Sequence, residues 1–113
     1  MTSLTLIGVM IVRERDIEQY LVKRAKAAGG RAYKFVSPGN NGVPDRIVLL
    51  PGGRIAFAEL KAPGKKPTPL QMNQQRFIAG LSLPVAVIDN KGDVDSLISR
   101  MQATEGMPQW PEQ

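Results

Sequence analysis

The sequence of 113 residues contains no cysteine and no histidine. These two residue types supply most zinc ligands and most general bases that work at neutral pH. Their absence excludes structural zinc, disulfides, thiol redox chemistry and both Ser-His-Asp and Cys-His catalysis. Aromatic residues are also scarce, at 5% of the chain. Any catalysis must therefore use carboxylates, lysine, arginine, hydroxyl groups or a hard metal ion.

Long hydrophobic runs are missing as well. The N-terminal apolar stretch, residues 4–12, spans nine positions and contains Thr5 and Gly8. A membrane-spanning helix needs about 20 apolar residues, and neither a basic leader nor a small-residue cleavage site accompanies the stretch. We therefore expect a globular protein of the cytoplasm with no membrane segment.

Negative charge is the scarcer sign, since 10 Asp and Glu residues face 15 Lys and Arg residues, for a net charge of +5. Residues 1–88 hold 13 of the basic and 5 of the acidic residues, whereas residues 89–113 hold 2 and 5. Such an excess favours a polyanionic partner such as nucleic acid. A solvated basic surface without a partner explains the charge alone equally well.

Apolar periodicity predicts a single α/β domain with the element order α-β-β-β-α-β-α. Helices are expected around residues 14–28, 68–81 and 93–101, and strands around 31–36, 45–50, 54–61 and 83–89. A helical crossover between the last two strands makes the last strand parallel to its neighbour. The expected architecture is a mixed sheet flanked by helices.

The start of the second helix has a strong local signal. Thr68 is a good N-cap, Pro69 suits the first helical position, and Gln71 completes a capping box. This role explains Gln71 without any catalysis. The apolar face of the helix is expected to consist of Leu70, Phe77, Ile78 and Leu81.

The two strands around Pro51-Gly52-Gly53 read as a β-hairpin with a three-residue loop. That loop places Leu50 opposite Arg54 and, further along, Asp45 opposite Glu59. A two-residue turn would shift the register by one and place the two carboxylates on opposite faces. The geometry of the hairpin therefore decides whether Asp45 and Glu59 meet.

Directly opposed carboxylates are destabilising unless a cation lies between them. Oxygen ligands without His or Cys point to Mg²⁺, with Mn²⁺ as a substitute. Lys61 follows on the same face as Glu59 because side chains alternate along a strand. The alternative interpretation is that Glu59 and Lys61 form the solvated end of an edge strand.

The set Gly42-Val43-Pro44-Asp45, Glu59-Leu60-Lys61, Gln71 and Glu18 resembles the VRR-NUC (virus-type replication-repair nuclease) branch of the PD-(D/E)xK nucleases. The resemblance covers about residues 10–101 and leaves 1–9 as an extension and 102–113 as a tail. It implies a restriction-endonuclease-like core in a stand-alone protein of a bacterial cell or a phage-infected host.

The resemblance also implies roles for these residues. Asp45, Glu59, the backbone carbonyl of Leu60 and Glu18 would bind Mg²⁺. Lys61 would orient or deprotonate the attacking water and stabilise the transition state. Gln71 would lie beside the site. Without the resemblance, the favoured interpretation of Glu18 is an exposed helix residue in an ion pair.

Phosphate contacts are expected from residues on or beside the loops, because compact charges near turns position DNA rather than read its bases. The candidates are Arg31, Lys34, Ser37, Lys65, Lys66 and Arg76. The expected function is metal-dependent endonuclease cleavage of branched, junction or flap DNA, by a homodimer whose two-fold symmetry matches the substrate. The alternative is a non-catalytic DNA-binding or assembly module. A nucleotide hydrolase is disfavoured because no phosphate-binding P-loop occurs.

Overall fold

The computed structural model describes residues 12–106. Its elements are α2 (Glu14–Ala27), β1 (Arg31–Lys34), β2 (Arg46–Leu50), β3 (Arg54–Leu60), α3 (Pro69–Gly80), β4 (Val85–Ile88) and α4 (Lys91–Ala103). This order agrees with the order predicted from the sequence. The predicted extension over residues 1–9 lies outside the described residues, and α4 continues two residues into the predicted tail.

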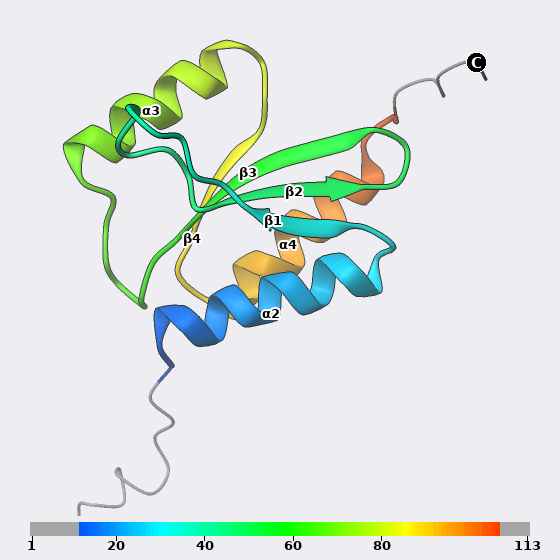
Figure 1. The fold of residues 1–113 in the computed structure, drawn as a ribbon. Helices are drawn as coiled ribbons and strands as arrows, with labels where there is room; N and C mark the ends of the chain where they lie inside the picture. The colour runs from blue at the N-terminus through cyan, green and yellow to red at the C-terminus, as the bar shows by residue number, and fades with distance from the viewer. Residues whose placement is uncertain (1–11, 107–113) are drawn as a thin grey trace, which may run out of the picture.

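The strands form one sheet in the order β1-β2-β3-β4. β1 pairs with β2 and β2 with β3 in antiparallel fashion, whereas β3 and β4 are parallel. Helices α2 and α4 pack side by side on one face of the sheet (Figure 1). α3 connects β3 to the edge strand β4 and lies at one end of the sheet, on the other side from α2 (Figure 1). The predicted mixed α/β architecture is confirmed.

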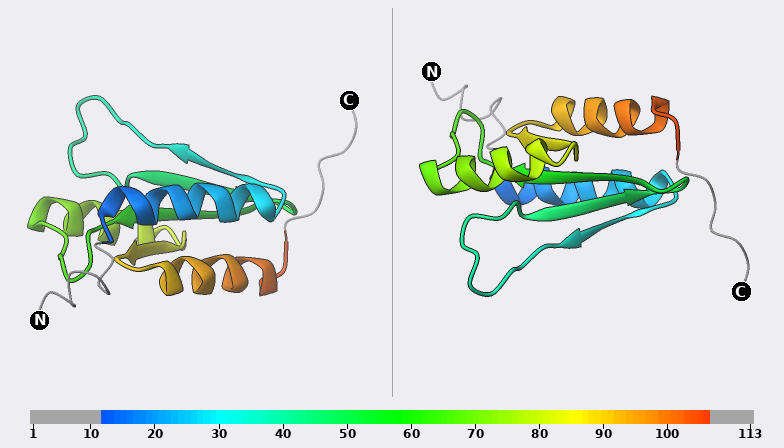
Figure 2. Two further views of the ribbon diagram at one scale, coloured as in Figure 1. Left: turned by 90° about the horizontal axis from the view of Figure 1, so that it is seen from below. Right: turned by 90° about the horizontal axis from the view of Figure 1, so that it is seen from above.

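The core fills the space between the sheet and the helix pair. Strand alternation sends Ala56, Ala58 and Leu60 of β3 toward α2 and α4, and each is at most 1% exposed. Ile17 and Leu21 of α2 face them and are fully buried. In the left view of Figure 2, seen from below, α2 crosses in front of the strands and α4 lies beside α2. One face of β3 therefore anchors the hairpin, and the other is left for polar side chains near its end.

The hairpin register agrees with the prediction. Leu50 pairs with Arg54 and Arg46 with Ala58, so the position opposite Glu59 belongs to Asp45, immediately before β2. Gly52 and Gly53 adopt φ values of 88° and 72°, a left-handed backbone region that glycine enters without steric cost. The three-residue turn thus sets the register that brings the two carboxylates to one face.

The predicted apolar face of α3 is not a buried face. Only Ile78 is buried, whereas Leu70, Phe77 and Leu81 are 50%, 67% and 58% exposed. The reason is that α3 packs on the edge strand β4 and on the loop before β2, not on the broad face of the sheet. At that loop, Gln74 Nε2 donates to the Asn41 carbonyl at 3.3 Å, and Gly42 lies against Leu70.

A further difference concerns the end of β1. This strand stops at Lys34, two residues before the predicted end, although the Phe35 N–H still donates to the Asp45 carbonyl at 2.8 Å. In α4, the Asp95 carboxylate accepts from Tyr20 Oη at 2.7 Å and Arg24 Nε at 2.9 Å. Asp95 thereby links α4 to α2. None of the helices between residues 12 and 106 has the length and apolar character to cross a bilayer.

Candidate active site

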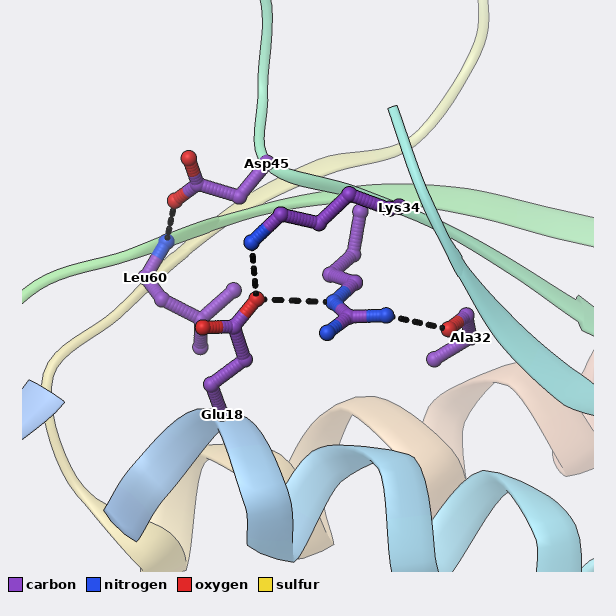
Figure 3. A network of polar contacts seen from close by, with 6 residues as sticks. Glu18, Ala32, Lys34, Asp45 and Leu60 are labelled. Atoms are coloured by element: carbon purple, nitrogen blue, oxygen red, sulfur yellow. Dashed lines mark hydrogen bonds and ion pairs between the residues drawn. The ribbon is translucent and has the colours of Figure 1, made fainter. Parts of the chain in front are cut away.

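Asp45 lies where the loop after β1 enters β2. The preceding residue, Pro44, is fully buried and fixes the chain against the sheet. Asp45 Oδ2 accepts a hydrogen bond from the Leu60 backbone N–H at 2.8 Å (Figure 3). The carboxylate is therefore held over the end of β3, beside the carboxyl group expected to act with it.

Glu59 is the one acidic side chain in the core among the described residues, and it is only 1% exposed. Its Oε2 accepts from Gln71 Nε2 at 2.8 Å and lies 3.4 Å from Lys61 Nζ. Its Oε1 is buried and receives no hydrogen bond from any residue between 12 and 106. Burial, together with the charge of Asp45, raises the pKa of Glu59 to about 7, and Lys61 opposes this rise. A buried carboxylate oxygen without a partner requires an explanation.

Gln71 joins the N-terminus of α3 to Glu59. Its Oε1 accepts from the Thr68 N–H at 2.9 Å, and Thr68 Oγ1 accepts from the Gln71 N–H at 3.2 Å. The amide nitrogen remains for Glu59. Different atoms of the Gln71 side chain therefore cap α3 and contact Glu59. Both the cap and a position beside the site were expected for Gln71 from the sequence.

Substitutions in the capping box separate these two roles. Thr68→Ala is expected to cost about 1 kcal/mol of stability through loss of the cap and to leave the DNA cleavage expected from the sequence within a factor of about three. Gln71→Ala removes the cap partner and the donor to Glu59, so we expect a similar loss of stability and a larger loss of cleavage. Chemical denaturation and a cleavage assay measure both quantities. Equal cleavage by the two variants would contradict a role for Gln71 in the site.

Glu18 extends from α2 toward the same end of the sheet (Figure 3). Its Oε2 accepts from Arg46 Nε at 2.8 Å and from Lys34 Nζ at 3.1 Å. Partial burial would raise the pKa of Glu18, but the bonds and charges of Arg46 and Lys34 outweigh burial and lower it. Glu18 is therefore a charged group with two cationic partners. Residues 12–106 contain no group of three acidic side chains close enough to form a metal cluster, so a direct contact between Glu18 and a metal ion stays a prediction.

The donors at the end of the hairpin suit a hard cation. Asp45 and Glu59 supply carboxylate oxygens, and the buried Oε1 of Glu59, which has no partner in the described part of the chain, is the kind of atom that a bound ion satisfies. Oxygen donors without nitrogen or sulfur match Mg²⁺ or Mn²⁺. Asp45, Glu59 and the neighbouring Leu60 backbone are thus the residues that would hold the ion.

The predicted phosphate-binding residues occupy different places. Lys34 lies beside Glu18, and Lys65 and Lys66 are exposed in the loop that follows Lys61. Ser37 Oγ accepts from Asn40 Nδ2 at 2.9 Å within the loop before β2. Arg76 is exposed on α3, where it donates to Asn73. Arg31 lies at the opposite end of β1 and lines a hollow of about 460 Å³ with Tyr33 and Pro51.

Sequence analysis did not single out Arg46, which contacts Glu18. A signal was present, because Arg46 shares a strand face with Val48 and Leu50, both buried. An arginine at the end of an apolar strand face needs an anionic or carbonyl partner on the covering element. The partner turned out to be on α2, 28 residues earlier in the chain.

A mixed four-stranded sheet with Asp45, Glu59 and Lys61 at the end of its central hairpin defines the restriction-endonuclease-like fold class. Over 88 residues the chain is 49% identical to "Putative nuclease p44" of Acyrthosiphon pisum secondary endosymbiont phage 1, a match that covers 78% of the chain and 94% of the relative. A solved structure described as a VRR_NUC domain superposes with a TM-score of 0.71 at 33% identity, covering 76% of this chain and 94% of the other. No family model matches the chain. On the relative and the solved structure together, the chain belongs to the VRR-NUC family, as the sequence motifs predicted.

Proposed function

We propose that this VRR-NUC protein is a Mg²⁺- or Mn²⁺-dependent endonuclease that hydrolyses phosphodiester bonds in branched, junction or flap DNA. The observation that carries the proposal is the buried Oε1 of Glu59, which receives no hydrogen bond within residues 12–106 although Asp45 and Lys61 lie beside it. A protein that only bound DNA would gain nothing from a buried, unsatisfied carboxylate facing a polyanion. The name of the phage relative, which describes a nuclease, supports the same class of activity.

The residues of the site divide the chemistry among them. Asp45, Glu59 and the Leu60 carbonyl would hold a divalent ion, which would acidify a water molecule and neutralise charge on the scissile phosphate. Lys61 lies 3.4 Å from Glu59 Oε2, so its ammonium group is positioned to orient or deprotonate the water and to stabilise negative charge in the transition state. Gln71 keeps the Glu59 carboxylate in one orientation through its bond to Oε2.

DNA is the substrate that the charge distribution favours. The exposed side chains of Lys65, Lys66 and Arg76 lie on α3 and the loop before it, which follow Lys61 along the chain. Contacts of this kind bind phosphates and carry no base sequence. Recognition by DNA shape rather than by sequence follows from them.

A homodimer is part of this proposal. Leu70 and Phe77 of α3 and the C-cap residue Leu81 are at least half exposed, and an apolar helix face of this kind is typical of a protein interface. A two-fold dimer would present two active sites to a two-fold branched substrate. Size-exclusion chromatography with light scattering checks the state, and a monomer at all concentrations would contradict this part of the proposal.

The decisive assay incubates the purified protein with labelled duplex, flap, splayed and four-way DNA in Mg²⁺, Mn²⁺ or EDTA. We expect cleavage that requires the cation and that favours branched substrates. Asp45→Asn is the informative variant, because the amide oxygen can still accept from the Leu60 N–H while the charge that binds the cation is lost. We expect its cleavage rate to fall at least about 100-fold.

Asp93→Asn is the matched control, since Asp93 is exposed near the start of α4 and makes no contact with the site. Unchanged cleavage by Asp45→Asn would overturn the assignment of the site. Tight DNA binding by the wild-type protein without cation-dependent cleavage would instead support the alternative of a non-catalytic DNA-binding module.

A further inference from the structure

Arg46 occupies an unusual position, because it follows Asp45 directly and points to the other face of the sheet. Along β2, the residues on the Arg46 face are Val48 and Leu50, which belong to the core. The Arg46 side chain is only 19% exposed. A guanidinium group in such a place is desolvated and needs hydrogen-bond or ion-pair partners that offset the free energy of desolvation.

The partners come from two other elements. Arg46 Nε donates to Glu18 Oε2 on α2 at 2.8 Å, and Nη1 donates to the Ala32 carbonyl on β1 at 2.9 Å (Figure 3). The donors of a guanidinium group have a fixed planar arrangement. With one donor held by the β1 backbone, the direction of the donor to Glu18 is set as well.

Lys34 is the second partner of Glu18, and it is less able to fix the carboxylate. Its side chain is 61% exposed and its Nζ lies 3.1 Å from Glu18 Oε2. Exposed lysine pairs are weak and are screened by salt. Lys34 can exchange Glu18 for a DNA phosphate, whereas Arg46 cannot leave without breaking its bond to β1.

We propose that Arg46 is a positioning residue of the nuclease, which holds the Glu18 carboxylate at the edge of the cation site formed by Asp45 and the Leu60 backbone. The inference rests on the proposed function and deepens it. Arg46 acts through Glu18 and touches neither the cation nor the substrate. One residue thus links the metal-binding end of the hairpin to helix α2.

Arg54 provides a matched control in the same hairpin. Its guanidinium donates to backbone carbonyls of Pro51 and Thr104 at distances between 2.7 and 3.1 Å. It therefore ties elements together as Arg46 does, but at the turn end of the hairpin and without a carboxylate partner. A purely structural effect of losing an arginine should appear equally in Arg54→Gln.

The test compares Arg46→Gln, Arg46→Lys, Glu18→Gln, the double variant Glu18→Gln/Arg46→Gln and Arg54→Gln. Three quantities are measured: the Mn²⁺ concentration for half-maximal cleavage, Ca²⁺ binding by calorimetry and DNA binding in EDTA. Residues that orient a metal site contribute about 10- to 100-fold in metal affinity. We expect Arg46→Gln to raise the Mn²⁺ requirement and weaken Ca²⁺ binding by about tenfold or more, with DNA binding in EDTA changed less than threefold.

Two comparisons show whether Arg46 works through Glu18. The double variant should be no worse than Glu18→Gln alone, and Arg46→Lys should recover part of the loss. Arg54→Gln should leave all three quantities unchanged. A Mn²⁺ requirement unchanged in Arg46→Gln, or a loss that adds fully to that of Glu18→Gln, would overturn the inference.

The measurements distinguish a failure of the proposed function from a failure of the inference on Arg46. Wild-type protein that binds Ca²⁺ but cleaves no DNA would refute the nuclease assignment, and Ca²⁺ binding by the variants would still decide the role of Arg46. Wild-type protein that neither binds Ca²⁺ nor cleaves DNA would refute both.

Discussion

Glu59→Gln is expected to stabilise the cation-free protein above pH 7 and to abolish DNA cleavage. The physical cause is the burial of a carboxyl group whose Oε1 has no partner among the described residues. Burial, assisted by the charge of Asp45, raises the pKa of Glu59 from 4.5 to about 7. Glutamine has the same shape and no charge to bury, and it also lacks the charge that a cation requires.

The direction of the pH dependence follows from this raised pKa. Below pH 4.5 the Glu59 carboxyl is protonated in both folded and unfolded chains, and its contribution to stability is fully present. Between pH 4.5 and about 7 the unfolded chain loses the proton first, so the stability of the folded protein falls. Above pH 7 both states are ionised and the loss is complete, at about 3 kcal/mol as an upper limit.

Denaturant titrations in EDTA at pH 5 and pH 8 measure this effect. The wild-type protein should lose about 2 to 3 kcal/mol more than Glu59→Gln between the two values. Added Mg²⁺ or Mn²⁺ should restore stability at pH 8 in the wild-type protein only. Glu105→Gln is the control, because Glu105 is exposed near the end of the described chain. Equal pH dependence in the wild-type and Glu59→Gln proteins would show that the pKa of Glu59 is not raised in the folded protein.

Lys61→Met is expected to lower the cleavage rate by about 10²- to 10⁴-fold, the usual contribution of a positioned acid–base group. The Lys61 side chain is 15% exposed and contacts Glu59, and methionine fills most of the same volume without the ammonium group. DNA binding should change little, because one charge among many is removed. Loss of the Lys61 charge also removes a factor that lowers the pKa of Glu59, so the variant should need a higher pH for cation binding.

Single-turnover cleavage at saturating Mn²⁺ separates the chemical step from cation binding. Lys26→Met on the exposed side of α2 removes the same charge far from the hairpin end and should cleave at the wild-type rate. A Lys61→Met protein that cleaves within threefold of wild type would exclude Lys61 as the group that acts on the attacking water.

The sequence was sufficient where local rules decide the structure. The register of Asp45 and Glu59 follows from the length of one turn and the two glycines in it. The position of Gln71 follows from a capping box that spans four residues. In both cases the interacting residues are close in the chain or joined by a single hairpin, so few alternatives compete.

The sequence was insufficient where the answer depends on how distant elements pack. The bonds of Glu18 to Lys34 and Arg46 join positions 16 and 28 residues apart, and no local pattern specifies them. The periodicity of α3 identified residues that share a helix face, but periodicity does not state what covers that face. The pattern suggested that Phe77 is a core residue, but Phe77 is exposed because no element covers this face of α3 within the described residues.

α3 is connected to both carboxylates of the proposed cation site. This helix buries a single apolar residue, Ile78, yet its first turn carries Gln71, which holds Glu59 Oε2. Its next turn is linked to the loop before Asp45 through Gln74 and Asn41. A displacement of α3 would therefore move Gln71, which contacts Glu59, and Gln74, which contacts the loop before Asp45, together.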